Sequence, residues 1–147
     1  MPATTAPAAK AAILGALGTR PNLTDIYRTW GAPTEADDVR YEHIYLGMVE
    51  VEGEWRTLGA GVRHESYTVE LFVVVIEYGD DEQTTEERAF ALLNEVSAAL
   101  AADRFLGGLL YQPAVIDTIR QDNTPVTLPG WGARITARVR CHAMFTP

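Results

Sequence analysis

The chain has 147 residues, 47% of them hydrophobic, and its 12 basic and 20 acidic residues give a formal net charge of −8. This length is enough for one domain with a hydrophobic core, and the net negative charge argues against a dedicated binder of nucleic acid or of anionic membranes. The single cysteine, Cys141, excludes a disulfide within the chain and fits a reducing compartment such as a bacterial cytoplasm.

The N-terminal segment predicts a helix of about a dozen residues. Thr4 or Thr5 can cap it, Pro7 fits its first turn, and Gly18 can end it. We expect it to dock on another element, because its apolar stripe is narrow. The stripe consists of Ala9, Ile13, Ala16 and Leu17. The same segment has no apolar run long enough for a signal peptide, which favours a protein that stays inside the cell.

Short strands are predicted next. Asp25–Trp30 has a strand pattern that Gly31 and Pro33 stop, and an acidic loop follows at 33–39. Two further runs, Tyr41–Val51 and Trp55–Leu58, flank the sequence EGE and predict a hairpin. A glycine-rich turn is expected at 59–65.

The segment 65–79, ESYTVELFVVVIEYG, has the strongest strand pattern in the chain. One face carries Tyr67, Val69, Leu71, Val73 and Val75. Beyond Leu71 the other face is apolar as well, with Phe72, Val74 and Ile76. A strand that is apolar on both faces belongs at the centre of a sheet covered on both sides, or at a subunit interface.

The segment 80–108 predicts the longest helix. Thr84 and Glu87 have the spacing of a capping box, and Gly107 and Gly108 are expected to end the helix. The acidic residues Asp80, Asp81 and Glu82 suit the positive end of the helix dipole. A divalent-metal site at these three residues is the less favoured interpretation.

The last third predicts a strand at 113–122, a turn-rich loop at 123–132 and a final strand, Ala133–Phe145. Strands clustered between and after two helices indicate the α+β class. We therefore expect a single domain, 1–147, with a mostly antiparallel sheet and with the N-terminal helix and the long helix packed on one face.

The final strand alternates cleanly between a core face and a basic polar face. The basic face carries Arg134, Arg138, Arg140 and His142, together with Thr136. Residues 35–95 contain sixteen acidic and four basic residues, a net charge of −12. A solvated surface is the simplest interpretation of the basic stripe. The alternatives are an interface in which these residues meet the acidic middle of a neighbouring copy, and contact with nucleic acid.

No catalytic or cofactor-binding constellation is predicted. The three histidines, His43, His64 and His142, lack metal-ligand spacing to one another or to cysteine. Cys141 falls on the core face of its strand, which favours a buried, inert thiol. The glycines at 59–61 lack the strand–turn–helix context of a phosphate loop. We expect no metal, no cofactor and no enzymatic activity.

The order of these features resembles the tail terminator (tail completion) proteins of long-tailed bacteriophages, particularly those of actinobacterial hosts. The resemblance covers nearly the whole chain. It rests on the N-terminal helix followed by the segments LTDIYRTWGAPTE, ESYTVELFVVVIEYGD, TTEERAFALLNEVSAALAAD, RFLGGLLYQPAVID and GWGARITARVRCHAMF. It implies a small α+β protein that assembles as a six-membered ring, stops polymerisation of the tail tube and offers the surface to which the head attaches.

The same resemblance implies the partners and the location. These are further copies of the chain, the tail tube protein, the head–tail connector proteins and phage DNA in transit through the lumen, at the head-proximal end of a tail assembled in the host cytoplasm. No membrane partner is expected, since no segment reaches roughly 18 uninterrupted apolar residues. The alternatives are another connector or the tube protein itself, and a small α+β ligand-binding domain or enzyme.

Overall fold

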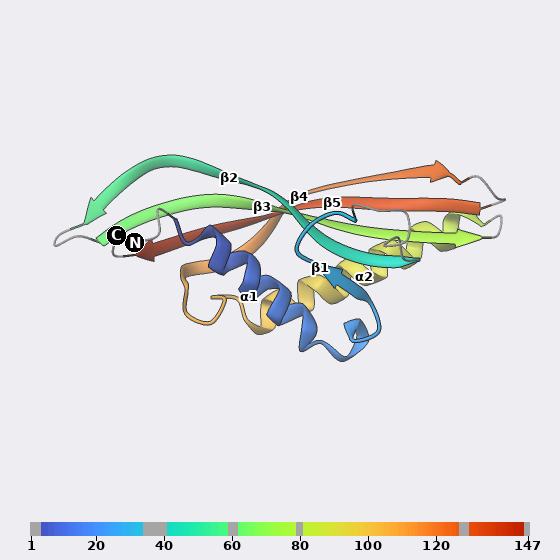
Figure 1. Ribbon diagram of the computed structural model, residues 1–147, viewed down its shortest axis with the longest axis horizontal. Helices are drawn as coiled ribbons and strands as arrows, with labels where there is room; N and C mark the ends of the chain where they lie inside the picture. Colours follow the sequence, from blue (N-terminus) through green and yellow to red (C-terminus); the bar gives the residue numbers. More distant parts are fainter. Residues whose placement is uncertain (1–3, 34–40, 59–61, 79–80, 127–129, 146–147) are drawn as a thin grey trace.

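A computed structural model describes residues 4–33, 41–58, 62–78, 81–126 and 130–145. The elements, in chain order, are α1 (Ala6–Gly18), a 3₁₀ turn (Pro21–Leu23), β1 (Tyr27–Thr29), β2 (Glu42–Leu58), β3 (Val62–Tyr78), α2 (Glu82–Ala102), β4 (Leu110–Pro125) and β5 (Gly130–Phe145). The strands form one sheet in the order β1-β2-β3-β5-β4, in which β1 is parallel to β2 and all other pairs are antiparallel. Both helices lie on the same side of the twisted sheet (Figure 1), so the expected α+β architecture is confirmed.

The core lies between the helices and one face of β3 and β5. On β5 the residues Ala133, Ile135, Ala137, Val139, Cys141 and Ala143 are all buried, which confirms the predicted alternation. The apolar stripe of α1 docks as expected, since Ala9, Ile13, Ala16 and Leu17 are buried as well. α2 supplies Ala89, Leu92, Leu93, Val96, Ala99 and Leu100 to the same cluster.

β3 is the central strand of the sheet, but the helices cover only one of its faces. Leu71, Val73 and Val75 face the helices and are fully buried. Phe72, Val74 and Ile76, on the other face, are only partly buried. Cover on both faces, one of the two expectations for this strand, is therefore not found within the described part of the chain.

The predicted hairpin around EGE is not formed. β2 is one continuous strand from Glu42 to Leu58, and it pairs antiparallel with β3. A register shift between Glu52 and Arg56 marks an irregularity where the sequence suggested a turn. A glycine between polar residues fits a bulge as well as a turn, so the local sequence could not separate the two. The acidic loop at 34–39, the turn glycines at 59–61 and Asp80 lie outside the described residues.

The predicted capping box of α2 is also wrong. The N-cap is Asp81, whose side chain accepts a 3.0 Å hydrogen bond from the backbone N–H of Thr84. Thr84 thus lies inside the first turn, and Glu87 instead accepts a hydrogen bond from Gln83. Aspartate is at least as good an N-cap as threonine, so the earlier residue starts the helix.

The other boundaries differ by a few residues. β1 is shorter than the predicted Asp25–Trp30 strand, and β4 and β5 extend into the predicted loop at 123–132. α2 ends at Ala102, and Gly107 and Gly108 lie in the following turn with φ of 69° and 87°. No helix in the described part of the chain combines the length and the apolar character needed to cross a lipid bilayer.

The strands are much longer than the helices that cover them. β2 and β3 have 17 residues each, which at about 3.4 Å per residue corresponds to roughly 55 Å. α1 has 13 residues and α2 has 21, or roughly 20 and 30 Å at about 1.5 Å per residue. At one end the sheet therefore extends well beyond α1 (Figure 1).

Candidate interaction surfaces

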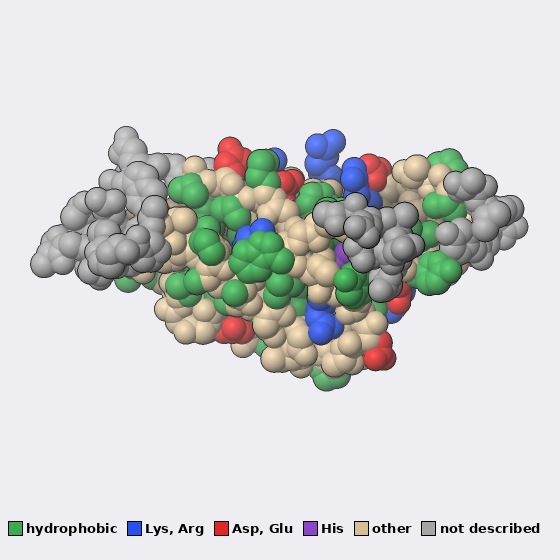
Figure 2. Space-filling model, in the orientation of Figure 1, with side chains coloured by type: hydrophobic (Ala, Val, Ile, Leu, Met, Phe, Trp, Pro, Cys, Tyr) green, Lys and Arg blue, Asp and Glu red, His purple; other side chains and the backbone are tan. Residues whose placement is uncertain are grey.

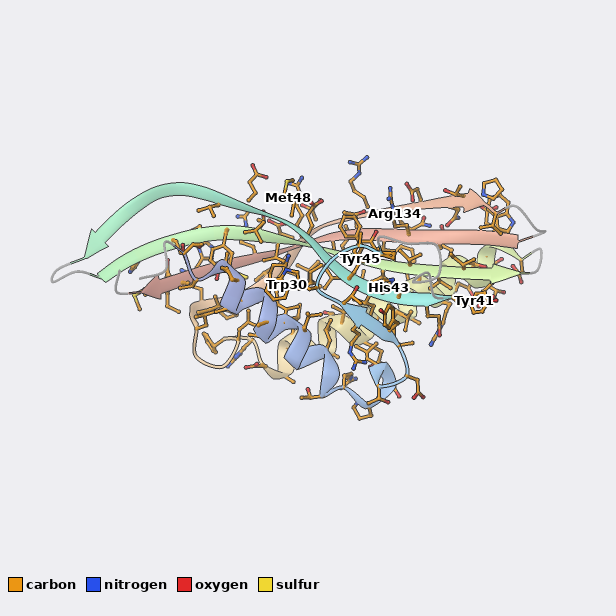
Figure 3. All side chains as sticks on the ribbon, viewed as in Figure 1. Trp30, Tyr41, His43, Tyr45, Met48 and Arg134 are labelled. Atoms are coloured by element: carbon orange, nitrogen blue, oxygen red, sulfur yellow. The ribbon has the colours of Figure 1, made fainter. Side chains whose placement is uncertain are left out.

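The predicted basic stripe lies on the face of β5 that points away from the helices. Its four residues, Arg134, Arg138, Arg140 and His142, alternate with the buried core residues of the same strand. Period-two alternation thus brings all four together on one surface, as the sequence predicted. Arg134 is labelled in Figure 3, where it projects from the sheet on the side opposite α1.

Two of the arginines find acidic partners within the same chain. Arg140 lies 2.7 Å from Asp117 and Arg134 lies 3.6 Å from Asp122, and both aspartates belong to β4. These pairs are solvent-exposed, so each contributes little to folding. Arg138 forms no salt bridge within the described residues, and its strand neighbours are Glu70 on β3 and Thr118 on β4. Of the three arginines in the stripe, Arg138 is therefore the one best placed to form a salt bridge with another protein.

His142 belongs to a different environment from the arginines. Its Nδ1 lies 2.8 Å from the Ser66 hydroxyl on β3, and the ring of Tyr111 lies 6.1 Å away. Tyr111 also packs on His64, with ring centroids 4.7 Å apart. The Nε2 atom of His64 is buried without a hydrogen-bond partner in the described structure. The stripe thus ends in a packed aromatic group.

At the opposite edge of the sheet, aromatic residues gather where β1 pairs with β2. The His43 ring lies 4.7 Å from Tyr27 and 5.2 Å from Tyr45, and Tyr45 stacks on Phe72 at 4.8 Å. His43 is 2% exposed, and its Nε2 lies 2.7 Å from the Thr29 hydroxyl. The spacing of the histidines in the sequence gave no sign of this cluster, because strands distant in sequence build it.

Lys10 joins α1 to this edge. Its ammonium donates a 3.0 Å hydrogen bond to the Gly47 carbonyl and lies 4.7 Å from the centre of the Trp30 ring. Burial lowers the pKa of Lys10, and the carbonyl and the ring together compensate part of its lost hydration. Figure 2 shows hydrophobic side chains gathered over α1 in this view.

Exposed hydrophobic side chains flank both edges of the sheet. Near β1 and β2, Trp30, Tyr41 and Met48 are 46%, 65% and 64% exposed (Figure 3). On β4, Val115 and Ile119 are 52% and 51% exposed. Aromatic residues and methionine are enriched at protein interfaces. The two edges are therefore candidate contact surfaces, and they differ in composition.

The charges also divide across the sheet. Among the described side chains, β2 and β3 carry no lysine or arginine and five glutamates: Glu42, Glu50, Glu65, Glu70 and Glu77. β4 and β5 carry two aspartates and four arginines: Asp117, Asp122, Arg120, Arg134, Arg138 and Arg140. One half of the sheet is thus acidic and the other is basic.

The side chains that the sequence offered for chemistry, Cys141 and Asp81, have structural roles in the fold. Cys141 is fully buried, and burial raises the pKa of its thiol to about 12, so the predicted buried thiol is confirmed. Asp81, from the acidic group before α2, is the helix cap. Among the described residues, no three His, Cys, Asp or Glu side chains lie close enough together to hold a metal ion.

A depression of about 310 Å³ lies on the uncovered face between β3, β5 and β4. Its walls include Val74 and Ile76 on one side and Asp122 and Arg134 on the other. It is open to solvent, and the Arg134–Asp122 ion pair lies in its wall. Such a feature resembles part of a protein contact surface more than an enclosed ligand pocket.

No protein-family model matches the chain, and no curated protein sequence matches it. Among solved structures, a chain of the virion of a native gene transfer agent (GTA) particle is similar, with a TM-score of 0.58 and 16% sequence identity. The match covers 98% of this chain and 100% of that chain. The chain therefore shares its fold with that chain over nearly its full length.

Proposed function

We propose that this chain is a structural protein of a phage-like virion. The observation that carries the proposal is the end-to-end similarity of fold to a chain of a gene transfer agent virion. Because a fold alone does not define a function, the surfaces supply a second argument. The sheet has two long edges, and each is flanked by exposed hydrophobic side chains suited to contacts between proteins.

Within the virion, we propose the role of tail terminator for the single domain 1–147. In this role six copies close into a ring at the head-proximal end of the tail, stop polymerisation of the tube and form the surface to which the head attaches. The order of helices and strands supports it, since it resembles that of tail terminator proteins along nearly the whole chain. The opposite charges of the two sheet halves also suit a ring, in which two different surfaces of each copy must meet.

The partners in this role are neighbouring copies, the tail tube protein and the connector proteins of the head, with DNA passing through the lumen. Assembly takes place in the host cytoplasm. We propose Arg134, Arg138, Arg140 and His142 as a surface that faces a neighbouring subunit or the lumen. Arg138, which has no salt bridge within the described residues, is the member to test first.

Electron microscopy of the purified protein, alone and with tail tubes, tests the proposal. We expect closed rings of uniform size and, with tubes, a ring at one end only. A phage that lacks the protein should produce tubes of uncontrolled length and heads without tails. Filaments that grow without limit would identify a tube protein instead. Normal tube length together with unattached heads would identify another connector.

A second measurement separates a structural role from an enzymatic one. The proposed function depends on contact surfaces and involves no catalysis. Arg138→Glu should therefore weaken assembly. Binding of a small molecule that survives complete loss of self-association would favour the ligand-binding alternative.

A further inference from the structure

β4 forms one edge of the sheet, and its only strand partner among the described residues is β5. Register shifts interrupt this pairing before Thr118, whereas from Thr118 to Pro125 it is continuous. Pro125 ends the usable stretch, because proline has no N–H to donate to a further strand. The regular segment between the last register shift and Pro125 is therefore the part of the edge best suited to accept another strand.

The backbone groups that point outward along this segment belong to alternate residues. Val126, directly after β4, donates a 3.2 Å backbone hydrogen bond to Gly130 of β5. Because the register is continuous, the even-numbered residues of the segment bond to β5 in the same way. The backbone N–H and C=O groups of the odd-numbered residues therefore point to the free edge: Ile119, Gln121 and Asn123. Within the described structure these groups have no hydrogen-bond partner.

The charges of the segment are self-complementary. Arg120 and Asp122 are both exposed and lie two residues apart on the uncovered face of the sheet. If two identical segments pair antiparallel with Gln121 at the centre, Arg120 of each copy lies directly opposite Asp122 of the other. A pair centred one residue earlier would oppose two arginines, and a pair centred one residue later would oppose two aspartates. Opposite charges at opposed positions stabilise antiparallel strands, whereas like charges destabilise them.

β5 continues this alternation of charge. Arg134 lies opposite Asp122 in the sheet and 3.6 Å from its carboxylate, and the two side chains are 53% and 63% exposed. A depression of about 180 Å³ is bordered by Arg120, Asp122 and Arg134, so the carboxylate is accessible to a second guanidinium. The other aspartate of β4, Asp117, lies before the segment and pairs with Arg140 at 2.7 Å. In the pair, Asp122 would therefore lie between an arginine of its own chain and one of the second copy.

On the helix side of the sheet, exposed apolar side chains lie beside the same segment. α2 runs antiparallel to β4, since its first turns accept hydrogen bonds from Asn123 and the Arg104 carbonyl beyond its end accepts one from Ala114. Phe90 lies between these two contacts along the helix, as Ile119 does along the strand, and the two side chains are 38% and 51% exposed. A two-fold pair would gather these side chains of both copies around its axis and remove part of their surface from water.

We propose that β4 of one copy pairs antiparallel with β4 of a second copy about a two-fold axis at Gln121, so that their sheets join edge to edge. Ile119 of each copy then exchanges backbone hydrogen bonds with Asn123 of the other. The contact is isologous, so it joins copies, or whole rings of copies, in pairs and cannot itself close a ring. It therefore goes beyond the proposed function, whose ring contacts must use other surfaces.

Charge reversal tests the pair. Arg120→Asp gives a segment with two aspartates and Asp122→Arg gives one with two arginines, so each variant alone opposes like charges. In sedimentation velocity over a concentration series, we expect the wild-type protein to pair and each variant to associate at least about tenfold more weakly. An equimolar mixture should recover the association, because every aspartate then meets an arginine. Glu87→Arg and Arg104→Asp, at exposed positions on and after α2, carry the same charge changes and should associate like wild type.

Cysteine cross-linking tests the register. In a Cys141→Ala background, Gln121→Cys places two thiols at the axis, where the Cα atoms of a hydrogen-bonded pair are about 5.5 Å apart, within the reach of a disulfide. Ile119→Cys separates the thiols by four residues, roughly 13 Å along the strand, which a disulfide cannot span. We expect mild oxidation to link the Gln121→Cys protein into dimers and to leave the Ile119→Cys protein unlinked.

Several results would overturn the inference: a wild-type protein that stays monomeric at every concentration, single variants that associate as wild type does, or a mixture that fails to recover association. Linkage of Ile119→Cys without linkage of Gln121→Cys would exclude the register. Tube length separates this inference from the proposed function. If the wild-type protein pairs as described but its absence leaves tube length unchanged, tail termination is refuted and the β4 pair stands.

Discussion

The carboxylate of Glu65, on β3, accepts a 2.6 Å hydrogen bond from the backbone N–H of Thr5, the N-cap residue of α1. The Thr5 hydroxyl also donates to Glu65, and the Thr4 hydroxyl donates to its other oxygen at 2.8 Å. Thr5 makes no capping hydrogen bond with its own side chain. A strand about sixty residues away in sequence therefore provides the anion that helix N-termini attract.

Removal of this carboxylate should destabilise the protein. Glu65 is 3% exposed, so Glu65→Ala leaves the buried Thr5 amide without its acceptor and also removes the carboxylate that accepts from the Thr4 and Thr5 hydroxyls. We expect a loss of about 2–3 kcal/mol in the free energy of unfolding, measured by denaturant titration. Glu70→Ala, on the uncovered face of the same strand, is the control. Equal small effects of the two substitutions would show that the contact does not anchor α1.

Two glycine substitutions should have opposite effects. A Cβ atom at Gly47 would lie 2.6 Å from the Phe72 ring and 3.3 Å from the Cβ of Glu70, whereas one at Gly15 meets nothing within 4 Å. Gly47→Ala should cost about 1–3 kcal/mol through overpacking. Gly15→Ala, inside α1, should stabilise by about 0.5–1 kcal/mol. Thermal unfolding of both variants measures the difference, and stabilisation by Gly47→Ala would contradict the packing of Phe72.

The Cys141 thiol should be unreactive in the folded protein. It has no exposed surface, and burial raises its pKa to about 12. A maleimide at pH 8 should label it only as fast as the protein unfolds. Met48→Cys in a Cys141→Ala background, with the thiol at a 64% exposed position, should react at once. Rapid labelling of Cys141 without denaturant would show that this part of the core opens.

The same pKa shift predicts loss of stability in alkali. The folded thiol has a raised pKa, and burial raises the pKa of Tyr67 too. Above about pH 9 the unfolded chain therefore releases protons that the folded chain retains, so the free energy of unfolding falls as pH rises. The decline should be shallower in Cys141→Ala, and equal slopes from pH 9 to 11 would exclude a contribution from the thiol.

At the acid end, Asp81 should contribute in the opposite sense. The hydrogen bonds from the Thr84 hydroxyl and N–H lower the pKa of Asp81 below its unfolded value. Its stabilisation is therefore complete above the unfolded pKa and is lost as pH falls through the folded pKa. Asp81→Ala should lower the melting temperature at pH 7, and the difference from wild type should disappear in acid. If Thr84→Ala lowered the melting temperature at pH 7 more than Asp81→Ala does, Thr84 would be the N-cap, as the sequence predicted.

Much of the fold was evident from the sequence because local periodicity reports it directly. The alternation of β5 identified both its core face and its basic stripe, and the apolar stripe of α1 identified four residues that are buried in the core. The same alternation predicted that the thiol of Cys141 is buried, and the structure confirms it.

Only the tertiary structure decided which residues meet across the sheet. The pairing of Arg140 with Asp117, the His43 aromatic cluster and the capping of α1 by Glu65 join segments that no local pattern links. Strand order is likewise a matter of long-range pairing, so the sequence could not reveal that β4 and most of β2 are unpaired edges. Periodicity fixes which way a side chain points, whereas its neighbours depend on how distant strands come together.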